Sequence, residues 1–311
     1  MNRPKLSVVV PVFNEEENLP HLYARLNAVA QKCAGESYEF IFVSDGSRDN
    51  TEVLLLELAA TDPHVRYIFF SRNFGHQPAI SAGLDVALGE YVVIIDGDLQ
   101  DPPELIEQML QKAAEGFEVV YARRKERKGD PALKKVAANV FYRLLRSITQ
   151  VEIPLDTGDF RLIHHKVVEV VRRMPEKNKF LRGQISWIGF RQTYVEFERD
   201  PRLHGTSGYS YLKLLKLAIT GITSFSDLPL RMATLLGFLV TAVSFAVGLY
   251  ALYAKYTGHA LFPGWSSTLV CILFLGGVQL LCLGIIGEYL ARLYHDMRNR
   301  PLYVVRESNA G

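Results

Sequence analysis

The sequence predicts an α/β fold with a mostly parallel, Rossmann-like sheet, followed by an interfacial helix and two transmembrane helices. Apolar runs rich in Val, Ile and Phe alternate with segments of helical length near the N-terminus, a pattern typical of a doubly wound sheet. Charged residues are frequent up to Arg231 and then become rare. Since the chain has 311 residues, it is long enough for more than one domain.

Each strand is predicted from an apolar run that ends at turn residues. These runs are residues 6–12, 40–43, 65–70 and 91–95, and a fifth strand is expected at 118–121. Amphipathic segments of ordinary helix length separate them, at residues 15–33, 49–60, 78–87 and 103–115. Further along, the pattern favours a helix at 131–149 and a strand at 192–198.

Two long apolar segments follow. Residues 232–254 carry no charge and would be about 34 Å long as a helix, against a bilayer core of roughly 30 Å. Residues 267–290 are similar and contain only Glu288. Arg231 precedes the first segment and arginines follow the second, so the positive-inside rule places the rest of the chain in the cytoplasm. A buried helical hairpin of a soluble domain is the alternative.

Composition divides the chain into four parts. We expect a cytoplasmic α/β domain at 1–208, a juxtamembrane amphipathic helix at 209–230, a transmembrane hairpin at 231–291 and a cytoplasmic tail at 292–311. Packing of residues 209–224 against the soluble body is the alternative to an interfacial helix. The chain has three cysteines, without metal or redox spacing, so a disulfide scaffold is excluded.

The sequence DGDLQD at residues 96–101 is the most informative stretch. It follows an apolar run, so a buried strand would deliver Asp96 and Asp98 to the edge where open α/β sheets bind ligands. Two carboxylates this close repel each other unless a cation lies between them. Oxygen ligands suit Mg²⁺ or Mn²⁺, held together with the phosphates of a bound substrate. A surface turn is the alternative, because Asp, Gly and Pro are common turn residues.

The first two predicted strands each end in a short segment with acidic and other polar residues, PVFNE at 11–15 and SDGSRD at 44–49. Both are expected on the sheet edge that holds the acidic stretch. Asp45 can accept a hydrogen bond from a ring N–H, and backbone N–H groups near Gly46 can contact a ribose or phosphate. Each segment alone is more typical of a helix N-cap turn. Together with the acidic stretch they predict a nucleotide site.

These motifs, with RNFGH at 72–76, resemble the nucleotide-sugar motifs of family 2 glycosyltransferases, which have the GT-A fold. Further motifs narrow the resemblance to bactoprenol glucosyltransferases of the Gtr type, relatives of dolichol-phosphate mannose synthase. They are GDFRL at 158–162, GITSFS at 221–226, FLGGVQ at 274–279 and GEY at 287–289. The likeness spans nearly the whole chain.

The resemblance implies roles for individual residues. Asp96, Asp98 and Gln100 would bind the metal, Mg²⁺ or Mn²⁺. The nucleotide sugar would be bound by loop residues, which are Pro11, Val12, Asn14, Glu15, Asp45, Ser47, Asn73, Gly75, Asp96 and Gly97. Asp159 and Asp98 are the candidate catalytic residues. Arg123, Arg127 and Arg202 are candidates for an acceptor phosphate, because a guanidinium group matches phosphate geometry.

Two positions depart from the family pattern. Ser44 stands where many relatives have a second Asp, and Gly208 replaces a common Lys, for which Arg202, His204 or Lys213 would compensate. A phosphate acceptor is already anionic at neutral pH, so the reaction does not require a strong base. We therefore expect Asp159 to orient the sugar or the acceptor, with a loop or helix cap as the alternative. The histidines, His76 among them, lack metal-ligand spacing and are expected at surface or packing positions.

The expected function is inverting transfer of glucose from UDP-glucose to a membrane polyprenyl phosphate such as undecaprenyl phosphate. Mannose or an aminoarabinose derivative is the alternative sugar. The expected partners are the UDP-sugar, the lipid, the membrane and further copies of this chain, with no nucleic acid. The expected location is the inner membrane, with both termini cytoplasmic. A non-catalytic membrane scaffold or a flippase subunit is the alternative from a different class.

Overall fold

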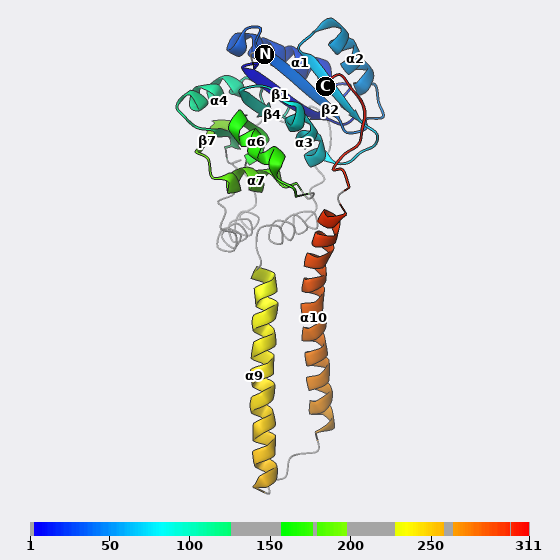
Figure 1. Cartoon of the computed structure of the whole chain (residues 1–311), viewed down its shortest axis with the longest axis vertical. Coiled ribbons are helices and arrows are strands. Elements are labelled where there is room, and N and C mark those ends of the chain that lie inside the picture. Colours follow the sequence, from blue (N-terminus) through cyan, green and yellow to red (C-terminus); the bar gives the residue numbers. More distant parts are fainter. Residues whose placement is uncertain are drawn as a thin grey trace. The chain divides into compact units, whose positions relative to one another are not determined.

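A computed structural model describes residues 3–125, 157–176, 179–197, 228–257, 264–298 and 300–310. The chain separates into two compact units. The first comprises Met1–Arg146, Val151–Tyr209 and Arg300–Gly311, and the second comprises Ser147–Gln150 and Ser210–Asn299. The first unit holds a sheet with its helices, and the second holds two long helices (Figure 1).

Within the described residues, the first unit contains an eight-stranded sheet with the order β7-β5-β6-β4-β1-β2-β3-β8. The strands are β1 (Leu6–Val12), β2 (Tyr38–Ser44), β3 (Val65–Phe70), β4 (Tyr91–Ile94), β5 (Val119–Arg124), β6 (Thr157–His164), β7 (Gln192–Phe197) and β8 (Val305–Ser308). Strand β1 pairs in parallel with β2 and β4, as β2 does with β3 and β5 with β7. Strands β6 and β8 pair only antiparallel, so the sheet is mixed around the predicted parallel centre.

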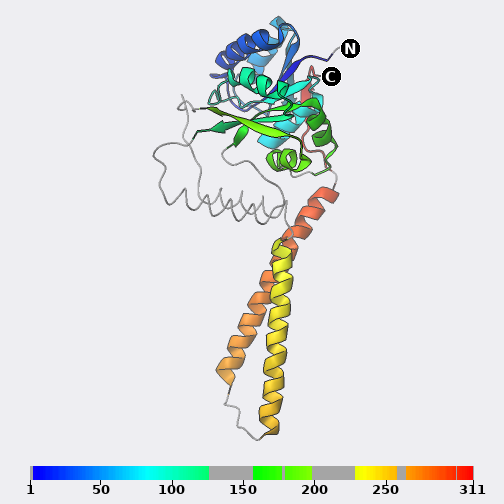
Figure 2. The ribbon, with the colours of Figure 1, turned by 90° about the vertical axis from the view of Figure 1, so that its left-hand side faces the viewer.

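Helices cover both faces of the sheet (Figure 2). Helices α1 (Leu19–Ala34), α2 (Thr51–Thr61) and α4 (Leu105–Ala114) pack on one face, with alternate β1 residues such as Val8 and Val10. Helices α3 (His76–Val86), α6 (His165–Arg173) and α7 (Leu181–Ile188) pack on the other face, with Val9. Side chains of a strand alternate between faces, so a strand covered on both sides is apolar throughout. This explains the unbroken apolar runs of the sequence.

The predicted strands at 6–12 and 65–70 match β1 and β3. The helices expected at 49–60, 78–87 and 103–115 correspond to α2, α3 and α4, and each begins and ends within two residues of the prediction. The first helix starts later than expected, at Leu19. Pro20 lies in its first turn, and the backbone N–H of Glu15 instead donates to Oγ1 of Thr51 at 2.9 Å. The segment at 15–18 is therefore part of a loop that contacts the start of α2.

Strand β8 was not indicated by the sequence pattern. It forms an edge of the sheet beside β3, although some 230 residues separate the two strands in the chain. Asn309 accepts a hydrogen bond from the backbone N–H of Tyr67 at 2.6 Å, and Ala310 is buried. The Tyr303 ring stacks on Phe70 with centroids 4.9 Å apart. The residues that follow the second long helix thus belong to the first unit.

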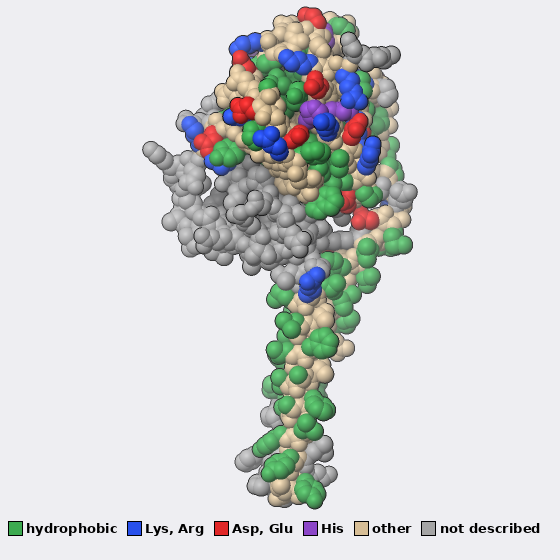
Figure 3. Space-filling model, turned by 60° about the vertical axis from the view of Figure 1, so that its left-hand side comes forward, with side chains coloured by type: hydrophobic (Ala, Val, Ile, Leu, Met, Phe, Trp, Pro, Cys, Tyr) green, Lys and Arg blue, Asp and Glu red, His purple; other side chains and the backbone are tan. Residues whose placement is uncertain are grey.

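The second unit consists, in its described part, of helices α9 (Leu228–Tyr256) and α10 (Trp265–Met297), which run side by side. Both are long and apolar enough to cross a membrane, with mean hydropathies of 2.1 over Pro229–Tyr250 and 2.4 over Val270–Ala291. Hydrophobic side chains are exposed along this hairpin (Figure 3). The segments expected at 131–149 and 209–224 lie outside the described residues, as do Arg127, Arg202, His204, Gly208 and Lys213.

Candidate active site

The loops that follow β1, β2 and β4 meet at one edge of the sheet, as the sequence predicted. Gly97 is packed so tightly there that an added Cβ would lie 3.0 Å from Val12 and 3.2 Å from the carbonyl oxygen of Pro11. Contacts this short leave little room for a side chain. The acidic stretch at 96–101 therefore lies directly against the end of β1, and Glu15 of the following loop is 3.6 Å from the same position.

The loop after β2 is held against the segment after β3. At Gly46, φ is +71° and an added Cβ would lie 2.6 Å from the backbone carbon of Arg72. The Asp45 carboxylate accepts hydrogen bonds from the backbone N–H groups of Phe74 at 2.6 Å and Gly75 at 2.9 Å. Asp45, Asn73 and Gly75, predicted to bind the nucleotide, thus come from two loops that contact each other.

Two residues other than glycine have left-handed backbone among those described, Asn14 with φ +55° and Leu99 with φ +57°. This conformation is unfavourable for side chains and is maintained by surrounding contacts. For Asn14 these contacts come from the loop after β2: its N–H donates to Oγ of Ser47 at 3.1 Å, and its Oδ1 accepts from the N–H of Arg48 at 2.8 Å. Both residues lie in segments that the sequence assigned to the site.

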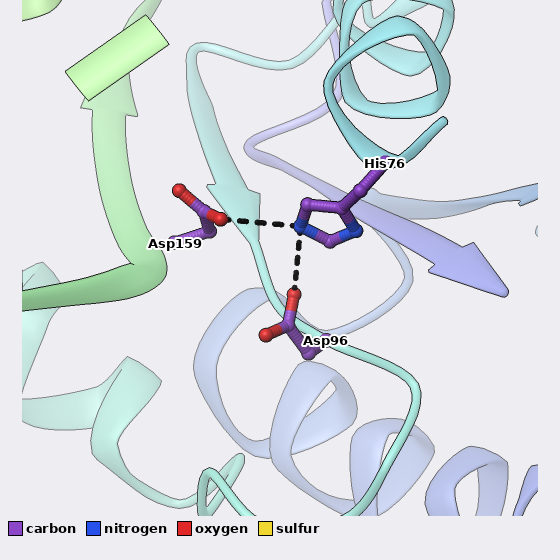
Figure 4. Close-up of side chains that lie close together, drawn as sticks. All are labelled: His76, Asp96 and Asp159. Atoms are coloured by element: carbon purple, nitrogen blue, oxygen red, sulfur yellow. Dashed lines mark hydrogen bonds and ion pairs between the residues drawn. The ribbon is translucent and has the colours of Figure 1, made fainter. Parts of the chain in front are cut away.

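Asp159 reaches this edge through strand β6, which runs antiparallel to β4. Ile94 pairs with Arg161, and continuing that register by two residues sets Asp159 opposite Asp96. The ring of His76, the first residue of α3, lies between the two carboxylates (Figure 4). Its Nε2 is 3.2 Å from Oδ2 of Asp159 and 3.3 Å from Oδ1 of Asp96.

Asp159 is surrounded by donors and is only 8% exposed. Its Oδ1 accepts from Nε of Arg182 at 2.9 Å and from the buried guanidinium of Arg161 at 3.2 Å. Burial alone would raise its pKa, but the hydrogen bond from His76 and the charges of Arg182 and Arg161 lower the pKa well below its usual range. Asp159 is therefore held as a carboxylate.

Asp96 has the opposite electrostatic environment. Burial raises the pKa of Asp96 to about 6, and the carboxylates of Asp159, Asp101 and Asp98 act in the same direction, while His76 opposes them. Burial disfavours the charged form of His76, but the hydrogen bond to Asp159 and the charges of Asp96 and Asp159 raise its pKa. The site thus concentrates negative charge that a cation would stabilise.

The residues present fit a divalent cation. Oε1 of Gln100 is buried and accepts no hydrogen bond within the described residues, whereas Oδ1 of Asp96, also buried, has its described contact in the 3.3 Å ion pair with His76. Buried polar atoms normally have partners, so the unpartnered Gln100 oxygen and the Asp96 carboxylate are suited to a metal ligand role. Oδ1 of Asp98 accepts from the backbone N–H of Gln100 at 3.1 Å. A second set, His76, Asp96 and Asp159, has ligand atoms within 4.8 Å of one another and shares Asp96 with the first.

Arg123 does not join this cluster through any described contact. It lies at the end of β5, where its guanidinium pairs with Glu196 and stacks 3.6 Å from the centre of the Tyr194 ring. Its role toward an acceptor phosphate stays a prediction. The other two candidate arginines lie outside the described residues.

Sequence reasoning missed His76 and Arg182. The structure corrects the expectation that His76 takes a surface or packing role, because its ring bridges Asp96 and Asp159. Its position in the RNFGH motif, one residue after the predicted site residue Gly75, was the available signal. For Arg182 there was none, since its partner lies 23 residues away and only the packing of α7 brings them together.

Comparison with known proteins decides the family. The model of glycosyl transferase family 2 matches residues 7–172, which include all four loops and Asp159. The chain is a family 2 glycosyltransferase. A second family model, the GtrB C-terminal hairpin, matches residues 228–293 of this glycosyltransferase, which contain α9 and nearly all of α10.

Relatives match the glycosyltransferase over nearly its full length. YkcC of Bacillus subtilis (strain 168), named an uncharacterized glycosyltransferase, is 49% identical over 97% of this chain and 93% of that protein. The SfII prophage-derived bactoprenol glucosyl transferase of Shigella flexneri is 43% identical over 99% of both chains. Among solved structures, a mannosyltransferase from Pyrobaculum calidifontis in complex with GDP-Man and Mn²⁺ covers 91% of this chain and 88% of that chain, with 15% identity and a TM-score of 0.46. That last likeness is too distant to add to the family assignment.

Proposed function

We propose that this glycosyltransferase transfers glucose from UDP-glucose to the phosphate of a membrane polyprenyl phosphate, with inversion at the anomeric carbon. The observation that carries the proposal is the match to bactoprenol glucosyl transferases over 99% of the chain, because it includes the hairpin as well as the sheet. A lipid acceptor stays in the bilayer, so its enzyme must be held at the membrane surface. The paired apolar helices meet that requirement.

The donor would bind across the loops at the carboxyl ends of β1, β2 and β4. Asn14 and Glu15, Ser47 and Asp45, and the segment at Asn73 to Gly75 would hold the nucleotide. Asp96, Asp98 and Gln100 would hold Mg²⁺ or Mn²⁺, and oxygen ligands do not by themselves select between these ions. When bound, the ion would neutralise charge on the departing nucleoside diphosphate.

The residues around Asp159 support a positioning role. A carboxylate held anionic by Arg161 and Arg182 is a weak base, and a phosphate monoester is already an anionic nucleophile near neutral pH. Asp159 would orient the sugar or the acceptor for in-line attack by the phosphate oxygen on the anomeric carbon. His76 would keep Asp159 and Asp96 at a fixed separation.

We also propose a topology with the catalytic unit and both termini in the cytoplasm, at the inner membrane. Strand β8 follows the second apolar helix in sequence and pairs with β3, so the chain must leave and re-enter the same unit. An even number of membrane crossings satisfies this condition. An engineered cysteine in the 258–263 segment that is labelled from outside intact cells, when one at an exposed position such as Glu36 is not, would support this topology.

The decisive experiment incubates membranes that contain the full chain with labelled UDP-glucose, a divalent cation and polyprenyl phosphate. Label in the organic extract of wild-type membranes, absent with Asp98→Asn, supports the proposal. A parallel panel with UDP-N-acetylglucosamine, GDP-mannose and UDP-aminoarabinose tests the sugar. Transfer of another sugar alone would overturn the glucose assignment, and nucleotide binding without any transfer would indicate a scaffold.

A further inference from the structure

A chain of hydrogen bonds connects the C-terminal strand to the loop that carries Asn14. The guanidinium of Arg306, on β8, pairs with Oε2 of Glu52 in the first turn of α2. The other carboxylate oxygen of Glu52 accepts from the hydroxyl of Ser44 at 2.9 Å. One side chain, of which 15% is exposed, thus joins β8 to the end of β2.

The chain continues from Ser44 into the site. Oγ of Ser44 accepts from the backbone N–H of Ser47 at 3.2 Å, and Oγ of Ser47 accepts from the N–H of Asn14 at 3.1 Å. Asn adopts the left-handed backbone more readily than most residues, and these contacts further stabilise that conformation at Asn14. The loop after β1 is therefore linked to Arg306 through Ser47, Ser44 and Glu52, beside contacts of its own such as that of Glu15 with Thr51.

Arg306 is one of several residues that hold β8 in place. The strand is fixed by other contacts, including the Tyr303 ring stacked on Phe70 and the Asn309 side chain on the Tyr67 backbone. Arg306 itself is half exposed. Its described ion pair is directed at Glu52, and its guanidinium also lies 6.0 Å from the centre of the Phe69 ring on β3. The Lys variant and the melting temperature therefore serve to distinguish loop support from strand docking.

We propose that Arg306 is a positioning residue for the donor nucleotide: through Glu52 and Ser44, the segment after the second long helix sets the conformation of the loops at 11–15 and 44–49. The functional part of this inference rests on the proposed function, because those loops are the proposed nucleotide site. Its structural part does not, since loop order can be measured without any sugar.

The test compares full-length Arg306→Gln with Glu307→Gln in detergent or nanodiscs. Glu307 is the neighbouring residue on β8, and it accepts a hydrogen bond from the exposed Tyr67 hydroxyl at 3.3 Å, away from the loops. Three quantities are measured: hydrogen exchange of peptides covering 11–17 and 44–50, the Kd for UDP, and KM and kcat with the nucleotide sugar. The melting temperature of each variant serves as a folding check.

We expect Arg306→Gln to speed exchange in both loop peptides and to raise the Kd for UDP and the donor KM by about two- to fivefold, with kcat within twofold. Arg306→Lys should restore part of the loss, and Ser44→Ala combined with Arg306→Gln should be less than additive. Unchanged loop exchange, or an equal effect of Glu307→Gln, would overturn the inference. If wild-type protein transferred no glucose, the proposed function would fail, while the exchange data would still decide whether Arg306 orders the loops.

Discussion

Arg182 donates from Nε to Oδ1 of Asp159 over 2.9 Å, an ion pair that fixes helix α7 to the beginning of strand β6. The same oxygen also accepts from Arg161. Two guanidinium groups on one buried carboxylate stabilise its charged form and leave it little affinity for a proton. This arrangement makes the base role and the positioning role of Asp159 experimentally separable.

Replacing Asp159 by Asn should leave measurable turnover. Loss of a positioning group is expected to lower kcat by about 10- to 100-fold, and loss of a general base by up to about 10⁴-fold. Single-turnover transfer measured between about pH 5.5 and 8.5 checks this, since the acidic limb of the profile should not move. Arg182→Lys is the matched variant and should retain most activity. Complete loss with Asn but not with Glu would contradict positioning.

Binding of a divalent cation should depend on pH through Asp96. The pKa of Asp96 is about 6 in the folded protein against 3.8 for an ordinary aspartate carboxyl, so the folded state binds more protons than the unfolded state between these values. The free energy of unfolding of the metal-free protein should therefore fall as pH rises from about 4 to 6. A cation that pairs with the carboxylate reverses this loss.

The increase in melting temperature caused by Mn²⁺ alone should consequently be small at about pH 5 and large at about pH 7.5. Asp96→Asn should stabilise the metal-free protein near neutral pH and abolish the Mn²⁺ effect, and Gln100→Ala should weaken it. Asp85→Asn is the control, because burial also raises the pKa of Asp85 although this carboxyl pairs with Tyr303 outside the site. An equal Mn²⁺ effect at both pH values would refute the assignment.

Gly46→Ala should be more damaging than Gly35→Ala. Both glycines have positive φ, +71° and +59°, so both substitutions introduce backbone strain of about 1–3 kcal/mol. Only Gly46 is crowded, with Arg72 backbone 2.6 Å from the added Cβ, while Gly35 has no atom within 4 Å. We expect Gly46→Ala to destabilise by about 2–4 kcal/mol and to weaken UDP binding. Equal unfolding midpoints in urea for the two variants would contradict this expectation, because the close packing of Gly46 against Arg72 would then add nothing to the loss of stability.

Tyr303→Ala should destabilise the catalytic unit although Tyr303 follows the hairpin of α9 and α10 in sequence. The substitution removes the ring stacked on Phe70 and the hydroxyl that donates to Asp85 at 2.9 Å. A loss of about 2–3 kcal/mol is expected, against about 1 kcal/mol for Tyr303→Phe, which keeps the stacking. Limited proteolysis of the full chain measures the difference. Identical resistance of both variants would mean that β8 contributes little to the stability of the sheet.

The sequence was sufficient for the features that local patterns encode. Apolar runs bounded by turn residues located β1 to β4, because strands covered on both faces must be apolar throughout. Since parallel strands end at one edge, the same pattern predicted that the loops at Asn14, Asp45 and Asp96 meet. The two long apolar segments were likewise identified from their own hydropathy, without any knowledge of what they pack against.

Only the tertiary structure decided the contacts that depend on chain reversal and long-range packing. The antiparallel register of β6 brings Asp159 opposite Asp96, the start of α3 inserts His76 between them, and α7 supplies Arg182. Strand β8 carries too few apolar residues to be noticed and gains its stability from the edge of β3. These contacts stabilise the fold by joining segments that are distant in the sequence, so the local spacing of apolar residues does not predict them. The sequence thus determined which loops form the site, and packing determined which charges surround its carboxylates.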